Sequence, residues 1–202
     1  MKSISKLLLA AVAAAGITLP AAAQLTLSLS PTSQSTTLGG MTTYNVNISG
    51  LQSRPEGNEP ALGSFLLTLD YNPAIATAEA VSFGNYLSPS GPGNDTQMFD
   101  ITSTPGVIQL LDESDGTVTP ANQPSSFTLA TISIEGIGFG STPVSFDLSN
   151  SSLSDEASNP LDVSKVVNAS LTVVPEPGTC ALAIFGLGVL GFQARRRAAR
   201  LS

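Results

Sequence analysis

The stretch ALGSFLLTLDYNP, residues 61–73, decides the fold class of this chain. Residues 63–70 have the composition of a β-strand. The strand candidate runs into Asp70-Tyr71-Asn72-Pro73. Asp and Asn hydrogen-bond their own backbone in turns, and Pro73 disfavours a helical conformation for Asn72. We therefore predict a strand that ends in a tight turn, and a structural role for the residues of that turn.

The apolar period of two recurs on both sides of this stretch. Residues 25–29 and 43–48 alternate between apolar and polar side chains, as half-buried strands do. No central stretch of ten residues shows a helical stripe, and 72–78 would form at most one helical turn. Eight or nine short strands without βαβ spacing favour an all-β, antiparallel jelly-roll β-sandwich. Further strands are predicted at 63–70, 80–83, 107–111, 127–134, 144–148 and 166–174.

Charge and composition exclude several classes of function. The 202 residues carry a net charge of −7, but residues 24–174 hold 14 acidic residues against Arg54 and Lys165, a net charge of −12. Such a domain should repel nucleic acid. The chain has no His and a single Cys, which excludes a His-based catalytic triad and an intramolecular disulfide. We expect no enzymatic activity, because no pair of carboxylates stands out as a glycosidase site either.

The N-terminal residues 1–23 are typical of a signal peptide. Lys2 and Lys6 precede an apolar run at 7–17, and Ala21 and Ala23 form a small-residue cleavage site. The alternative is an N-terminal membrane anchor, but the run is shorter than the roughly 20 residues that a spanning helix needs. The mature chain should begin near Gln24, which makes the protein an exported one.

The C-terminal residues 175–202 contain three consecutive blocks. Pro175, Glu176 and Pro177 open a rigid polar motif at 175–179, and an uncharged apolar span follows at 180–192. An Arg-rich tail at 195–200 ends the segment. Its Arg195, Arg196 and Arg197 should remain cytoplasmic and stop the span. We predict a short C-terminal transmembrane helix that inserts only marginally, as a temporary tether to the inner membrane.

This arrangement resembles the bacterial PEP-CTERM sorting signal over residues 174–200. The resemblance implies processing by a membrane enzyme of the exosortase type, followed by release to the cell surface or extracellular matrix. Many members of that family carry Trp where this chain has Cys180. We interpret Cys180 as a small apolar residue of the span rather than as a lipidated or redox-active thiol.

The central residues 24–174 resemble cohesin domains. The resemblance rests on 61–73, on the Leu38-Gly39-Gly40 turn with the strand after it, and on FTLATISI at 127–134. It implies a nine-stranded jelly-roll sandwich, related to some carbohydrate-binding modules, that binds dockerin domains. The alternative is a secreted β-sandwich of no particular family.

Two acidic loops are candidate calcium sites. Asp112, Glu113 and Asp115 precede Gly116, and Asp155 is followed by Glu156. Calcium takes six to eight oxygen ligands, but the spacing is not that of an EF-hand loop. A solvated turn is the alternative in both places, and we expect no other cofactor.

Tyr86 is the candidate ligand-binding residue for a sugar. Aromatic faces bind saccharides, the chain has no Trp, and Tyr86 is the one Tyr that the strand pattern leaves in a loop.

Taken together, these features predict a non-enzymatic exported protein with a cohesin-like binding domain. Its partner would be a dockerin-like protein or an exopolysaccharide. The alternatives are a carbohydrate-binding module that attaches to exopolysaccharide, and a structural protein of the biofilm matrix.

Overall fold

The strand at the centre of the fold is β4 (Leu62–Asp70), which contains most of the stretch that predicts the fold class. Phe65, Leu67 and Leu69 point into the interior and are buried, whereas Ser64 and Leu66 lie on the other face and are partly exposed. Residues after β4 form the predicted turn. The Asn72 side chain accepts a hydrogen bond from the Ala74 N–H at 2.9 Å, and the Tyr71 N–H donates to the Gly106 carbonyl at 2.8 Å.

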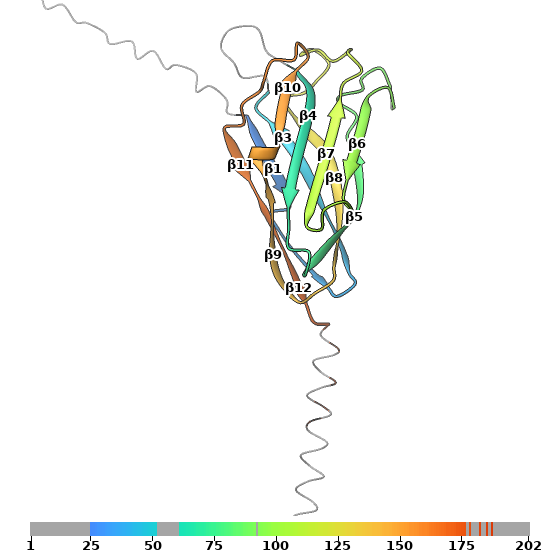
Figure 1. Ribbon diagram of the computed structural model, residues 1–202, viewed down its shortest axis with the longest axis vertical. Coiled ribbons are helices and arrows are strands. Elements are labelled where there is room, and N and C mark those ends of the chain that lie inside the picture. Colours follow the sequence, from blue (N-terminus) through green and yellow to red (C-terminus); the bar gives the residue numbers. More distant parts are fainter. Residues whose placement is uncertain are drawn as a thin grey trace, which may run out of the picture.

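The computed structural model describes residues 25–51, 61–91 and 93–176, together with residues 178, 182, 185 and 187. Its strands form two sheets packed face to face as a β-sandwich (Figure 1). One sheet has the order β11-β1-β3-β8-β5, and the other has the order β2-β12-β9-β4-β7-β6, with β10 also paired to β4. The other strands are β1 (Thr26–Ser30), β2 (Ser33–Thr37), β3 (Met41–Ser49), β5 (Ala76–Phe83), β6 (Thr96–Asp100), β7 (Val107–Glu113), β8 (Ser126–Gly136), β9 (Gly140–Phe146), β10 (Ser152–Asp155), β11 (Lys165–Val167) and β12 (Ala169–Val174), and a 3-10 turn η1 (Leu148–Asn150) follows β9.

The prediction of an antiparallel sandwich is confirmed for the interior strands and wrong at two edges. β1 pairs with β11 in parallel, and β2 pairs with β12 in parallel. Both exceptions arise because the first strands of the chain meet the last ones at the sheet edges. The N-terminal and C-terminal parts of the domain are therefore hydrogen-bonded to each other.

The described residues contain twelve strands, more than the eight or nine predicted. β2, with the sequence SQSTT, has no apolar residue and is therefore invisible to an apolar-period argument. β6 and β10 are short edge strands. The strand predicted at 166–174 is divided at Asn168 between the two sheets, so its two halves pair with different partners.

The core lies between the sheets and consists of the inward apolar residues of both. Leu27, Val46, Leu67, Ile108 and Ile132 are all fully buried. Tyr44 is also fully buried, and its hydroxyl donates to the Ser170 carbonyl at 2.8 Å. Burial raises the pKa of Tyr44 to about 12.

Several predicted features lie outside the described residues. These are the signal peptide at 1–23 with Ala21 and Ala23, and, in the C-terminal segment, Pro177, Cys180, Arg195, Arg196 and Arg197. Within the part of the chain that the structure describes, no helix is long and apolar enough to cross a membrane.

Candidate functional site: an apolar row on one sheet

Three apolar side chains form a row across the outer face of the sheet that contains β4, β7 and β6. The strand register places Leu66 of β4 opposite Leu111 of β7, and Leu111 opposite Met98 of β6. Met98 is 62% exposed. We call Leu66, Leu111 and Met98 the apolar row. Side chains opposite each other on one face of a sheet lie about 5 Å apart, so the three form a continuous strip.

Polar residues flank the apolar row on both sides. One flanking row consists of Ser64, Glu113 and Thr96, and the other of Thr68, Gln109 and Asp100. A strip of apolar surface between two polar rows has the layout of a protein interface, where an apolar centre is surrounded by a polar rim.

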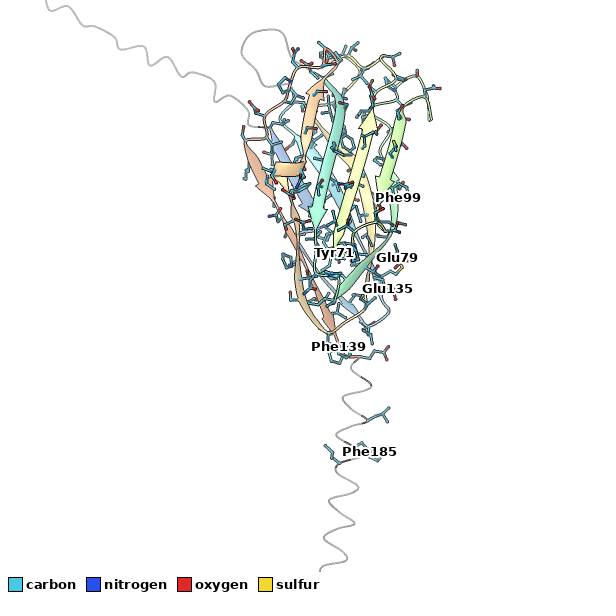
Figure 2. The ribbon with its side chains drawn as sticks, viewed as in Figure 1. Tyr71, Glu79, Phe99, Glu135, Phe139 and Phe185 are labelled. Carbon is cyan, nitrogen blue, oxygen red and sulfur yellow. The ribbon has the colours of Figure 1, made fainter. Side chains whose placement is uncertain are left out.

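The apolar row is hollowed rather than flat. A depression of about 170 Å³ is lined by its three residues together with Phe99, Asp100 and Gln109. The ring of Phe99 packs on Phe83 with 6.5 Å between centroids, and Phe83 packs on Phe65 of the core at 6.3 Å. Phe99 is thus held in place by the core while half of it remains exposed at the edge of the sandwich (Figure 2).

The rim of this depression carries negative charge. Hydrogen bonds from the side chain and backbone of Ser103, and from Thr102, lower the pKa of Asp100 to about 2. Asp100 therefore remains ionised at any physiological pH. With Glu113 in the opposite row, the surface favours a partner that brings an apolar centre and basic residues at its edge.

The three carboxylates of the first predicted calcium group do not point to one place. Asp112 faces the interior of the sandwich and is 1% exposed, whereas Glu113 lies on the outer face of the same strand. Asp115 belongs to the turn that follows, where it accepts hydrogen bonds from Ser90 and, at 2.9 Å, from the Thr117 N–H. These bonds lower its pKa, the one from Ser90 most. Among the described residues, no group of three or more His, Cys, Asp or Glu residues is arranged to hold a metal ion.

Asp112 has an unusual environment for a carboxylate. Among the residues that the structure describes, its Oδ1 and the Oδ1 of Asp95 are both buried without a hydrogen-bond partner. The other carboxylate oxygen of Asp95, Oδ2, accepts a hydrogen bond from the Gln97 amide at 2.8 Å. Gln97 lies opposite Asp112 in the sheet. Burial and, second, the charge of Asp95 raise the pKa of Asp112 to about 7. The carboxyl group of Asp112 therefore changes between its protonated and ionised forms near neutral pH.

The two predicted acidic loops meet around one polar depression of about 270 Å³. Glu113, Asp155 and Glu156 line it. Asp155 is already engaged in its own loop, since its carboxylate accepts the Ala157 N–H at 2.9 Å and the Asn159 N–H at 2.7 Å. The structure therefore brings the two loops together, with Asp155 acting as a turn residue.

Tyr86 is 41% exposed, so part of its ring remains accessible. Its ring packs against Phe127 with 4.9 Å between centroids, at an angle of 44°. One side of the ring is thus covered by another aromatic residue.

The described part of the sorting motif is accessible. Val173 is buried in β12, but Val174, Pro175 and Glu176 are exposed. β12 is hydrogen-bonded on both sides, to β2 and to β9. The motif thus begins one residue after a firmly held strand, where an enzyme can reach it without unfolding the domain.

The apolar row was not among the residues predicted from the sequence to be functional. A signal was present: Phe65-Leu66-Leu67 and Leu110-Leu111 are consecutive apolar residues within strands. Because successive side chains in a strand point to opposite faces, such runs place an apolar residue on the outer face. Met98 had no such signal, because β6 itself was not predicted.

Comparison with known proteins supports two features. The family model of the PEP-CTERM protein-sorting motif matches residues 173–197. Solved cohesin structures match the sandwich. The cohesin CaCohA2 from Clostridium acetobutylicum has 20% identity and a TM-score of 0.54, covering 75% of this chain and 92% of that one.

Two further cohesin structures match the sandwich to a similar extent. The sixth cohesin of scaffoldin B from Acetivibrio cellulolyticus, solved with a Cel5 dockerin, has 16% identity and a TM-score of 0.56, covering 75% and 99% of the two chains. A non-cellulosomal cohesin from Archaeoglobus fulgidus has 15% identity and a TM-score of 0.55, covering 79% and 97%. No curated protein sequence matches this chain. The chain therefore carries a PEP-CTERM sorting motif behind a domain with the cohesin fold.

Proposed function

We propose that this protein is a non-enzymatic binding protein of the cell surface or extracellular matrix, and that the apolar row binds a dockerin-type protein. The observation that carries the proposal is the apolar row, in which the exposed Met98 and the half-buried Leu66 and Leu111 form a hydrophobic strip between two polar rows on one sheet face. Cohesins of the same fold have been solved in complex with dockerins. A contiguous exposed apolar patch with a polar rim is a common mark of a protein interaction site.

The chemistry of the site fits binding better than catalysis. The chain has no His, and Asp112, whose pKa is raised, lies inside the sandwich rather than in either depression. The carboxylates of the predicted calcium group point in different directions, so we propose that Asp112, Glu113 and Asp115 do not hold a metal together.

The sorting motif supplies the route to the surface. In this proposal an exosortase-type enzyme processes the segment after β12, while the C-terminal span serves as a transient tether in the inner membrane. The exposed Pro175 and Glu176 support this step, because a protease or transpeptidase needs an extended, accessible substrate.

The binding claim is tested by titrating a panel of purified dockerin modules into the protein by calorimetry. Met98→Glu places a charge at the end of the apolar row, between Asp100 and Glu113. If the row is the centre of the interface, affinity should fall by about 30-fold or more, since central apolar contacts contribute on the order of 2 kcal/mol each.

Met41→Glu is the matched control, because Met41 is similarly exposed but lies at the start of β3 in the other sheet. It should leave the affinity unchanged. If no dockerin binds, or if both variants lose affinity equally, the proposal is wrong. Binding to exopolysaccharide that Tyr86→Ala abolishes would favour the carbohydrate-binding alternative. Binding to neither class would favour a structural role in the matrix.

A further inference from the structure

Exposed apolar side chains gather at the end of the sandwich from which the C-terminal segment continues. Five large apolar residues from three separate segments are exposed there, and we call them the apolar pole. Phe139, at 59%, is the most exposed of them. Figure 2 shows Phe139 at the tip of the sandwich, next to where the chain continues toward Phe185. The apolar pole consists of Leu38, Met41, Ile137, Phe139 and Val174.

Backbone hydrogen bonds bring these segments together. The Gly39 N–H donates to the Gly136 carbonyl at 2.7 Å, and the Gly136 N–H donates to the Gly40 carbonyl at 3.0 Å. These bonds join the β2–β3 turn to the β8–β9 turn. β12 ends at the same place, since Val174 pairs with Thr37. The grouping is therefore fixed by the sheet register.

The β8–β9 turn presents its apolar residues rigidly. The N–H groups of Ile137 and Gly138 both donate to the Ile75 carbonyl, at 2.8 and 3.1 Å. A Cβ at position 138 would overlap the Ala74 carbonyl, so only glycine allows the turn to lie this close to the chain before β5. With its backbone held down, the turn directs Ile137 and Phe139 outward, although burial would be favourable for both.

The apolar pole also lies close to the predicted membrane segment along the chain. Five residues, 175–179, separate Val174 from the apolar span that begins at position 180. Five residues extend over at most about 17 Å, and the polar region on each side of a bilayer is about 5–8 Å thick. If the span is inserted, the pole cannot move far from the bilayer surface.

We propose that the apolar pole rests in the membrane interface while the C-terminal segment is inserted, and that it thereby holds the sorting motif at the bilayer surface. This inference rests on the tether of the proposed function. The occupant is a lipid bilayer, because the adjoining chain is itself apolar: Leu182, Phe185 and Leu187 are all highly exposed. Because the tether makes the contact intramolecular, a small apolar contact is enough to sustain it.

The charges around the apolar pole indicate whether anionic lipids would strengthen its contact with the bilayer. Glu135 lies beside Met41 in the sheet, and Glu176 follows Val174 by two residues. Lys165 is the one basic residue within the described ranges, and it pairs with Thr26 at the opposite end of β1 and β3. The contact is therefore apolar, and anionic lipids should not strengthen it.

The test uses the full chain carrying Cys180→Ser, reconstituted into phosphatidylcholine vesicles. A single cysteine is introduced by Phe139→Cys and labelled with an environment-sensitive fluorophore such as nitrobenzoxadiazole. Leu148→Cys is the matched control, because Leu148 is also an exposed apolar residue but lies in η1, outside both the apolar pole and the apolar row. Phe185→Cys reports independently on insertion of the C-terminal segment.

We expect the label at 139 to shift to shorter wavelength and to be quenched by lipids with nitroxide-labelled acyl chains, and the label at 148 to remain as in water. Quenching at 185 but not at 139 overturns the apolar-pole contact while leaving the tether intact. Quenching at neither position overturns both. Quenching at 139 alone overturns the tether and, with it, the proposal that an inserted segment holds the pole at the bilayer.

Discussion

At the scale of single residues, Asp112 is the position whose chemistry depends most on the fold. It follows Leu111 on the surface and precedes the exposed Glu113, yet its own side chain lies between the sheets. The neighbouring Asp95 carboxylate raises its pKa further. A carboxyl group in this place is stable when protonated and destabilising when ionised.

The first prediction concerns the pH dependence of stability. The pKa of Asp112 is about 7 in the folded state and 3.8 without the environment of the fold. The folded state therefore binds more protons, so its stability is greatest below pH 4 with respect to this group and falls as the pH rises through 7. Asp112→Asn should stabilise the protein at pH 8 relative to wild type, by on the order of 2–4 kcal/mol, and by much less at pH 4–5. Urea denaturation across this range measures the difference.

Asp115→Asn is the control, because the contribution of Asp115 to stability should depend on pH in the opposite direction. Hydrogen bonds lower the pKa of Asp115, so its contribution is present above the unfolded pKa and is lost on acidification. This variant should be destabilised at neutral pH. A difference between wild type and Asp112→Asn that is constant from pH 5 to 8 would contradict the assignment. Loss of the pH dependence on adding calcium would show that Asp95 and Asp112 bind a cation instead.

At the scale of elements, β5 depends on the turn after β4. Its ladder to β8 contains a bulge between Ala78 and Ala80. The Ala78 N–H donates to the hydroxyl of the buried Tyr71 at 3.1 Å. The Tyr71 side chain therefore connects the turn after β4 to the irregular part of the next strand.

Removing this hydroxyl should be costly although it changes a single atom. In Tyr71→Phe the buried Ala78 N–H loses its acceptor, which should lower the free energy of unfolding by about 1–3 kcal/mol. Tyr86→Phe removes a hydroxyl that has no hydrogen bond among the described residues, and should change stability by less than about 0.5 kcal/mol. Equal effects in the two variants, measured by chemical denaturation, would show that the hydrogen bond contributes nothing.

The elements also show how far the sequence predicts the fold. Strands with an apolar inner face, such as β3, β4, β7 and β8, were located to within a few residues, because burial on one face imposes the period of two. β2 and β6 were not predicted, since one is wholly polar and the other lies exposed at an edge. The apolar row could not be predicted as a whole. Met98 lies in β6, a strand that forms by pairing with β7 and has no apolar period of its own.

At the scale of the whole molecule, the two surfaces to which we assign different proposed roles lie in different places. The strands of the apolar row, β4, β7 and β6, form the side of the sandwich, whereas β12 ends, with Val174 of the apolar pole, where the chain continues into the sorting segment (Figure 1). This separation allows the domain to be held at the membrane by one surface while the other stays accessible. The acidic charge of residues 24–174 belongs to the domain, whereas six of the eight basic residues lie in the predicted signals at the two ends.

The central claim is that this domain reaches the cell surface as a processed binding protein. It is tested most directly by the intact mass of the protein extracted from surface or matrix material. We predict a chain that begins near Gln24 and lacks the apolar span and the Arg-rich tail, with Glu176→Ala slowing the appearance of this form. Surface material that retains the complete C-terminal segment, detected as its peptides by mass spectrometry, would contradict the claim.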